Sequence, residues 1–191
     1  MTIRAKTLLS LAITLIVLTV VFYFALVRIV SDGFAAVENT LAIRNVDRLR
    51  ETFASEIESL CTKTSDWAVW DDAYQFVQDR NPEFVQANIA PSAMSGMNLS
   101  LLAFFDAQGE VVHATSYNPK EDKLVPVLPA ILSAHFAARS ELIRHARADG
   151  EKSGILFTPG ALPLVYCSRA VVPTSGEGAV RGADVFAKSF D

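Results

Sequence analysis

The stretch SDWAVWDDAY, residues 65–74, holds both tryptophans of the chain and three acids within about three helical turns. On a helical wheel Trp67, Trp70, Asp71 and Tyr74 share one face, because they stand three or four positions apart. Asp71 would then lie in an aromatic stripe, where a carboxylate without a partner costs about 1–3 kcal/mol. The stretch therefore predicts a protein partner or a bound ligand for Asp71.

Two interpretations of this stretch stay open. In the structural one, Ser65 or Asp66 caps the helix and the aromatic rings pack in the core with their polar tips exposed. In the functional one, indole rings and carboxylates line a pocket for a small ligand, and that combination favours cations. The ligand-binding residues expected in the second case are Asp66, Trp67, Trp70, Asp71 and Tyr74.

The N-terminal region is apolar enough to cross a membrane. No charged residue occurs from Thr7 to Val27, and about 20 apolar residues span a bilayer as a helix. A cleavable signal peptide has a shorter apolar core and a small-x-small site, which Ala25-Leu26-Val27 does not provide. We therefore expect a cytoplasmic N-terminus at 1–6, a transmembrane signal anchor at 7–30 and an extracytoplasmic domain at 31–191, in the inner membrane and periplasm of a bacterium. Arg4 and Lys6 favour this orientation, whereas Arg28 weakens the charge asymmetry.

The segment after the anchor is acidic. Residues 1–30 hold three basic residues and no acid, so the remaining 14 basic residues face 21 acids, a net charge of −7. This charge argues against nucleic acid or anionic lipid as the main partner of the domain and favours amines or other small polar solutes as ligands. The 161 residues after position 30 are enough for one compact domain with a substantial core.

The chain has two cysteines, Cys61 and Cys167. A disulfide between them is permitted outside the cytoplasm, but their spacing does not require one, since isolated cysteines are also among the most buried residues. There is no Cys-x-x-Cys pair and no histidine at ligand spacing, so we expect no metal site and no cofactor.

A second amphipathic pattern follows the anchor and predicts a long stalk helix. Its charged residues occupy the side opposite the apolar positions. Such a helix packs on its own domain or pairs with a second copy, and a homodimer through the stalk is a hypothesis because Asn45 interrupts the heptads. The apolar positions are Phe34, Val37, Leu41, Val46, Leu49, Phe53, Ile57 and Leu60.

The rest of the chain predicts an α+β domain. Pro82 ends the helix of the Trp-rich stretch, and the order of elements beyond it gives a mostly antiparallel sheet of five strands with helices on one face. The expected elements are a helix at 82–88, a loop at 90–96, a hairpin of strands at 99–105 and 110–114, a helix at 129–147, and strands at 153–157, 162–172 and 179–190.

Two alternatives to a binding module were weighed. An exported hydrolase would use Asp71 or Asp66 as general base and Asp72 as acid, but adjacent helical residues point about 100° apart and cannot flank one scissile bond. A pilin-like structural protein also combines an apolar helix, a stalk and a sheet. The chain begins MTIRAK, without the glycine of a pilin leader, and has no acid before Asp32.

Other motifs carry little chemistry. The run GEGAVRG at 176–182 has its third glycine one position late for a phosphate loop and precedes a strand instead of a helix, so it indicates a hairpin turn. His113, His135 and His145 are scattered over different elements and are expected to be ordinary residues.

The sequence resembles the CHASE-type extracellular sensor domains of bacteria, fourth subtype, over roughly residues 45–191. The resemblance rests on the block DWAVWDDAY at 66–74, on Asn88 and Asn98, on FDAQGEVV at 105–112 and on GAVRG at 178–182. It implies a Cache- or PAS-like ligand-sensing module without catalytic activity of its own. It further implies a second membrane helix and a cytoplasmic output, such as a diguanylate cyclase, a cyclic di-GMP phosphodiesterase or a histidine kinase. Lys188 departs from the arginine usual in the family, and the output is expected to lie beyond Asp191.

Overall fold

The computed structural model describes residues 3–158, 160 and 162–189, without the side chains of residues 5, 9, 10, 29–43, 45 and 49. The chain divides into two compact units, Met1–Thr52 and Phe53–Asp191, called here the N-terminal and C-terminal units. One helix, α1 (Ile3–Ala68), supplies the described part of the N-terminal unit and the first residues of the C-terminal unit. The helical prediction for the anchor and the stalk is therefore confirmed for the backbone.

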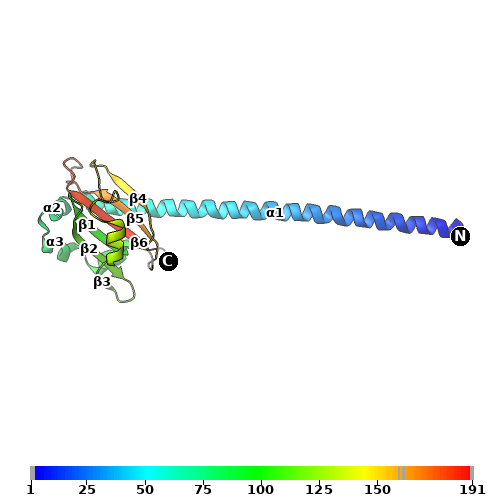
Figure 1. Cartoon of the computed structure of the whole chain (residues 1–191), viewed down its shortest axis with the longest axis horizontal. Coiled ribbons are helices and arrows are strands. Elements are labelled where there is room, and N and C mark those ends of the chain that lie inside the picture. The colour runs from blue at the N-terminus through cyan, green and yellow to red at the C-terminus, as the bar shows by residue number, and fades with distance from the viewer. Residues whose placement is uncertain (1–2, 159, 161, 190–191) are drawn as a thin grey trace. The chain divides into compact units, whose positions relative to one another are not determined.

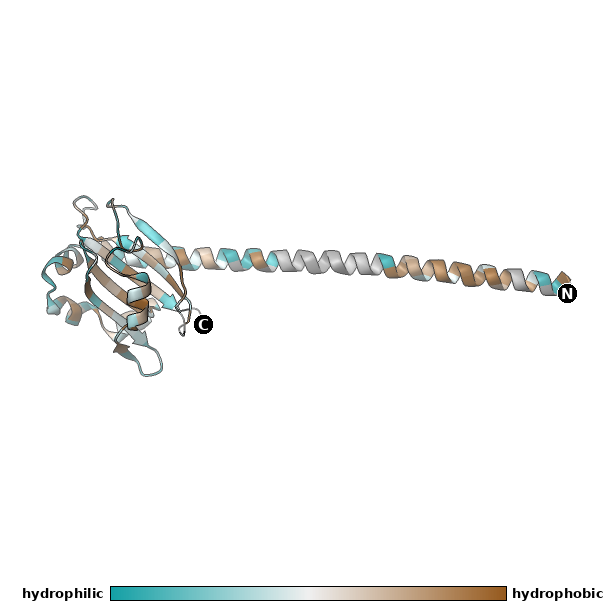
Figure 2. Cartoon of the chain, in the orientation of Figure 1, coloured by the Kyte–Doolittle hydropathy of each residue, from teal (hydrophilic) through white to brown (hydrophobic). Residues whose placement is uncertain are grey.

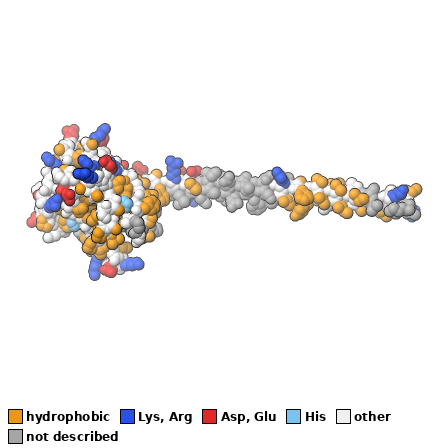
Figure 3. All heavy atoms as spheres, in the orientation of Figure 1, with side chains coloured by type: hydrophobic (Ala, Val, Ile, Leu, Met, Phe, Trp, Pro, Cys, Tyr) orange, Lys and Arg blue, Asp and Glu red, His pale blue; other side chains and the backbone are white. Residues whose placement is uncertain are grey.

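The N-terminal unit contains one segment suited to a membrane. Lys6–Arg28 has a mean hydropathy of 2.6 and none of its described side chains is buried, so by length and composition it is able to cross a bilayer. Figure 2 shows this apolar run in brown, and Figure 3 shows hydrophobic side chains on the described surface of the same segment. Of the predicted stalk stripe, the side chains of Phe34, Val37, Leu41 and Leu49 lie outside the described residues.

The C-terminal unit is built on one antiparallel sheet of six strands in the order β3-β2-β1-β6-β5-β4 (Figure 1). The predicted antiparallel sheet is confirmed, but the expected number of five strands was wrong. The missed strand, β3, has only three residues and follows a charged turn, so it shows no alternation of its own. The strands are β1 (Leu101–Asp106), β2 (Val111–Asn118), β3 (Lys123–Val125), β4 (Glu151–Leu156), β5 (Leu164–Ala170) and β6 (Gly182–Ser189).

The predicted β1–β2 hairpin is confirmed, and its turn chemistry explains why. The side chain of Asp106 accepts hydrogen bonds from the backbone N–H groups of Gln108 and Glu110 at 3.0 and 2.9 Å. Gly109 has φ +83°, and a Cβ there would lie 2.3 Å from the carbonyl oxygen of Ala138. Only glycine fits this position without strain.

Four short helices complete the unit: α2 (Asp71–Asp79), α3 (Pro82–Asn88), α4 (Pro91–Met97) and α5 (Pro129–His135). The helix at 82–88 is confirmed. The loop expected at 90–96 was wrong, because Pro91 begins a helix instead of preventing one. The helix expected at 129–147 ends at His135, where Ser140 donates a hydrogen bond to the carbonyl oxygen of His135 and accepts one from the backbone N–H of Leu142.

Both faces of the sheet are buried, so the prediction of helices on one face was wrong. Alternate residues of each strand enter different clusters, as the two-residue period of a strand requires. The α1-side cluster contains residues of the four helices from α1 through α4 together with Phe104 and Phe186 of the sheet. The α5-side cluster contains a residue of α5 together with Phe105 and Val185 of the sheet. The break in the 129–147 helix allows residues 136–143 to fold over the second face, where Phe136 and Ile143 are buried.

The Trp-rich stretch is two helices, not one. Val69 forms a parallel bridge with Val172, and the N–H of Val172 donates to the carbonyl oxygen of Ala68 at 3.0 Å. Trp70 is extended, with φ −147° and ψ 132°, and precedes the first turn of α2. The pairing with the end of β5 thus interrupts the helix, and the common face expected for residues 67–77 does not form as drawn.

Candidate functional site

The two tryptophans of the predicted site contact each other and the α1-side cluster. Their ring centroids are 6.3 Å apart, Trp67 is edge-on to Phe186 at 5.6 Å, and Trp70 is 5.5 Å from Phe84. Both indoles are half-buried. Their rings therefore join the ends of α1 and α2 to the sheet and to α3.

Asp71 and Tyr74 are bonded to the loop between β5 and β6. The carboxylate of Asp71 accepts a hydrogen bond from the backbone N–H of Thr174 at 2.9 Å, and the N–H of Asp71 donates to the hydroxyl of Thr174 at 3.1 Å. The Tyr74 hydroxyl accepts from Nε of Arg181 at 3.3 Å. The partner that the sequence required for Asp71 is thus within the protein, at the exposed start of α2.

Replacing Asp71 or Thr174 with alanine is expected to lower the free energy of unfolding by about 0.5–1.5 kcal/mol, since each change removes one of the two hydrogen bonds that join these residues. The double variant loses both bonds, but its loss should be smaller than the sum of the two single losses, because breaking one bond loosens the geometry that holds the other. A double-mutant cycle by urea denaturation measures this coupling. Additive losses would show that the two residues act independently.

Asp66 lies apart from the other four predicted residues, in a groove of about 580 Å³ that we call the α1–β5 groove. One wall is α1 and the other is formed by β4 and β5. Of the five predicted site residues, which all lie in the described part of the chain, Asp66 alone lines it. The lining residues are Ala54, Ile57, Glu58, Cys61, Thr62, Ser65, Asp66, Glu151 and Arg169.

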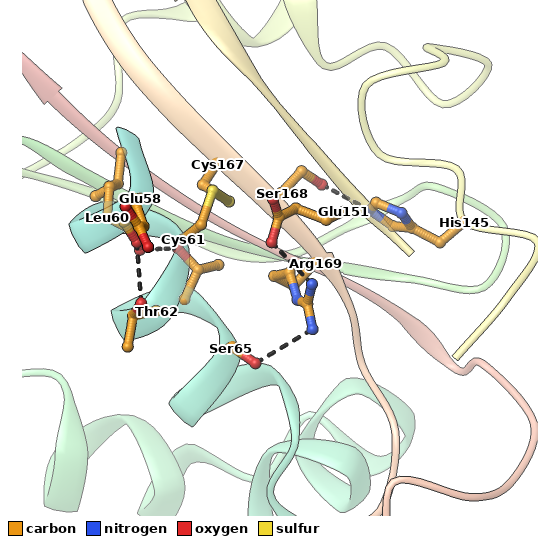
Figure 4. Close-up of a disulfide and its surroundings, with 11 residues drawn as sticks. Glu58, Leu60, Cys61, Thr62, Ser65, His145, Glu151, Cys167, Ser168 and Arg169 are labelled. Atoms are coloured by element: carbon orange, nitrogen blue, oxygen red, sulfur yellow. Dashed lines mark hydrogen bonds and ion pairs between the residues drawn. A yellow bond between two sulfur atoms is a disulfide. The ribbon is translucent and has the colours of Figure 1, made fainter. Parts of the chain in front are cut away.

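Arg169 is the one basic residue of the groove lining. Its guanidinium donates to Glu151 of β4 at 2.9 Å and to the Ser65 hydroxyl at 3.3 Å, and its side chain is 17% exposed (Figure 4). Because Arg169 is already paired with Glu151, the exposed carboxylates of Glu58 and Asp66 leave the groove with excess negative charge. This charge and the apolar side chains of the wall suit a small cation with an aliphatic part.

A disulfide between Cys61 and Cys167 borders the groove and links α1 to β5, with 5.2 Å between the two Cα atoms. The sequence left this pairing open, and the structure has it. Cys61 is 5% exposed and Cys167 is fully buried. Two helical turns further on, the bridge between Val69 and Val172 holds the end of α1 just beyond the C-terminal end of β5.

The chain enters and leaves the C-terminal unit at the same end of the sheet. Lys188, near the end of β6, forms an ion pair with Glu56 of α1 at 2.9 Å. The N–H of Ser189 donates to the hydroxyl of Ser100, just before β1. The end of β6 therefore lies beside the segment of α1 that begins the C-terminal unit.

Asp184 of β6 is a buried carboxyl group that sequence reasoning missed. It is Cα-paired with Phe104 and Arg169 and is two residues from Phe186, so it faces the α1-side cluster. Neither carboxyl oxygen has a hydrogen-bond partner among the described residues. Burial raises the pKa of Asp184 well above its ordinary value, opposed only by the nearby N–H of Val185, which lies outside hydrogen-bond geometry.

His145 is the corresponding buried base on the other face. Its Nε2 is 2.9 Å from the hydroxyl of Ser168. Burial, and then the charges of Lys152 and Arg169, lower the pKa of His145 to about 4. The neutral imidazole is therefore the form at neutral pH.

A smaller hollow of about 230 Å³ lies between α2 and α3, above the stacked rings of Phe76 and Phe84. Asp72 lines it, whereas Asp71 is bonded to Thr174. The two carboxylates of the hydrolase alternative therefore face different surroundings.

Comparison with known proteins gives one family. The CHASE4 domain model matches residues 52–191, nearly the C-terminal unit. The methanogenesis regulatory histidine kinase FilI of Methanothrix harundinacea is 24% identical over 154 residues, and the match covers 81% of this chain and 17% of that protein. The chain thus spans less than a fifth of this curated relative.

Two solved structures share the fold. One is a domain assigned to a sensory box/GGDEF family protein of Vibrio parahaemolyticus, with a TM-score of 0.55 at 10% identity over 78% of this chain and 58% of that one. The other is the extracellular domain assigned to the histidine kinase vpHK1S-Z8, with a TM-score of 0.56 at 14% identity over 81% and 59%. The predicted Cache/PAS-like α+β fold is confirmed.

Proposed function

Because the chain belongs to the CHASE4 domain family, we propose that it is the sensory input module of a membrane receptor. Residues 7–30 anchor it in the membrane, residues 31–191 lie outside the cytoplasm, and α1 carries the signal toward the membrane. The module itself performs no catalytic step. Its output, a histidine kinase or an enzyme of cyclic di-GMP turnover, would follow in the receptor.

The observation that carries this proposal is the shared end at which the chain enters and leaves the C-terminal unit. A receptor with a sensor on one side of a membrane and an output on the other needs both connections on the membrane side. The ion pair between Glu56 and Lys188 supports such an arrangement, since it joins the incoming helix to the last strand. A structural change in the sheet would then be transmitted to the incoming helix α1 and to the end of β6 together.

The ligand in this proposal is a small amine or another polar cation bound in the α1–β5 groove. Glu58 and Asp66 supply carboxylates eight residues apart on α1, which is about 12 Å along a helix. Ala54 and Ile57 supply the apolar wall. A ligand here would contact α1 and β5 together, and it would shift the module only as far as it binds one arrangement of them better than another.

Reporter fusions to the full chain test the membrane part of the proposal. Alkaline phosphatase at the C-terminus is expected to be active because it folds only outside the cytoplasm, whereas green fluorescent protein exported there in the unfolded state should stay dark. The reverse pattern would contradict the proposed localisation. Crosslinking of the full chain in membranes would show whether the stalk also forms a homodimer.

A thermal-shift series tests the ligand. Putrescine and spermidine are expected to raise the melting temperature of the full chain in detergent, and acetate is not. Asp66→Asn and Glu58→Gln should each reduce the shift, whereas the exposed Asp72→Asn on α2 serves as the matched control. Equal shifts in all variants would exclude the groove as the site.

A further inference from the structure

Three possible metal-binding side chains meet at the edge of the α1–β5 groove. The sulfur atoms of Cys61 and Cys167 and a carboxylate oxygen of Glu151 all lie within 4.8 Å of one another. The three residues come from α1, β5 and β4, and Figure 4 shows them together beside Arg169. Cys61 and Glu151 both line the groove, so the cluster is reached from solvent although the sulfur atoms are buried.

The geometry fits a tetrahedral metal ion once the sulfur atoms are free. Zinc binds thiolate sulfur at about 2.3 Å and carboxylate oxygen at about 2.0–2.2 Å, so two ligands of one ion lie about 3.5–4 Å apart. To reach these positions, the two sulfur atoms would move apart after reduction, and the carboxylate oxygen within 4.8 Å of them would approach the same ion. Three protein ligands would leave a fourth position open to water.

We propose that reduction of the Cys61–Cys167 disulfide creates a binding site for a thiophilic divalent cation such as Zn²⁺, with Cys61, Cys167 and Glu151 as ligands. A dithiol reductant supplies two electrons and two protons, is itself oxidised to a disulfide, and leaves two thiols. The metal ion then replaces the two thiol protons. In both states α1 stays joined to β5, first by a covalent bond and then through the ion.

Arg169 orients one of the proposed ligands, Glu151. One of its N–H groups is bonded to Oε2 of Glu151, which fixes the carboxylate and leaves Oε1 for the metal. Partners that orient a ligand in this way typically change metal affinity by about 10–100-fold. The inference does not depend on the amine proposed for the groove and stands if no amine binds there.

Cobalt provides the test, because Co²⁺ bound to thiolates has a charge-transfer absorption in the near ultraviolet. The full chain in detergent is reduced with tris(2-carboxyethyl)phosphine, which becomes the phosphine oxide by taking oxygen from water. The reduced chain is expected to bind one Co²⁺ with this absorption. Zn²⁺ should displace the bound Co²⁺, whereas Mg²⁺ should not. The oxidised chain should show no such band.

Variants separate this site from incidental thiol binding. Glu151→Gln is expected to weaken Co²⁺ binding at least about 10-fold, the scale on which metal sites respond to losing a supporting group. Asp72→Asn, which removes an exposed carboxylate on α2 outside the groove, should leave it unchanged. An equal affinity in Glu151→Gln, or no charge-transfer band in the reduced wild-type chain, would overturn the proposal.

The test remains decisive if reduction unfolds the chain. In that case Zn²⁺ is expected to restore the far-ultraviolet circular dichroism and cooperative melting of the wild type, because metal binding then contributes to folding. Failure of Zn²⁺ to restore the fold would equally overturn the proposal.

Discussion

Replacing both Cys61 and Cys167 with alanine is expected to lower the free energy of unfolding of the C-terminal unit by about 4 kcal/mol. The two cysteines are 106 residues apart, so the bond closes a loop that includes most of the unit. Closing a loop of about 100 residues restricts the unfolded chain by up to about 4.7 kcal/mol, and measured effects usually fall below this limit. A loss of this size is a large share of the stability of a domain of this length.

The measurement is chemical denaturation of the full chain, with a chelator present to exclude metal ions. Cys61→Ala alone should lose about as much as the double variant, because either change removes the bond and the effects are not additive. The wild type under reducing conditions should approach the same midpoint. A loss below about 1 kcal/mol in all three cases would mean that the disulfide contributes little to folding.

The second large effect is expected at Asp184, where Asp184→Asn should make the C-terminal unit more stable at neutral pH. The folded-state pKa of Asp184 is raised well above its ordinary value by burial. The folded chain therefore holds a proton that the unfolded chain releases, and stability falls as the pH rises from about 4 toward the folded-state pKa. Asparagine has no proton to lose, so the gain should be about 1–3 kcal/mol at neutral pH and should disappear near pH 4.

The stability of the wild type also depends on pH through His145, and this dependence opposes that of Asp184. The folded-state pKa of His145 is lowered to about 4, so its contribution is lost as the pH falls from about 6.5 toward 4. His113, on the strand beyond Phe104, has a pKa lowered by burial and acts in the same direction. Melting temperatures of Asp184→Asn and wild type must therefore be compared as a difference at each pH.

Asp72→Asn is the matched control for Asp184→Asn, since it removes an exposed aspartate from the same unit. Its difference from the wild type should stay nearly constant across the pH range. A constant difference for Asp184→Asn as well would show that the buried carboxyl does not hold its proton in the folded chain.

The sequence predicted the family and the antiparallel sheet because both depend on local patterns. The turn of the β1–β2 hairpin is encoded by Asp106 and Gly109 within a few residues. The break in the Trp-rich stretch could not be predicted in this way. The helix ends because Val69 pairs with Val172, which lies about a hundred residues later in the chain. A helical wheel includes no such partner.

For the same reason, Asp66 alone among the residues predicted to bind a ligand lines the α1–β5 groove. Arg169 and Glu151 are adjacent across β4 and β5, but the register that pairs them is fixed by the fold. Arg169 did leave a signal, since it is the only charged residue in the strand LVYCSRA. A lone arginine in an otherwise buried strand indicates a partner or a ligand, and this signal was available from the sequence.

The position of the disulfide limits how α1 moves against the sheet. With 5.2 Å between the Cα atoms of Cys61 and Cys167, the helix is fastened near the middle of its contact with β5, and sliding by a whole helical turn of about 5.4 Å would break the bond. The oxidised helix is left with tilting about the disulfide, and such a tilt would strain the Glu56–Lys188 ion pair at one end and the Val69–Val172 bridge at the other. Reduction with no metal ion in place of the bond would also allow lengthwise movement of α1, so the same module would move in two different ways according to the state of one bond.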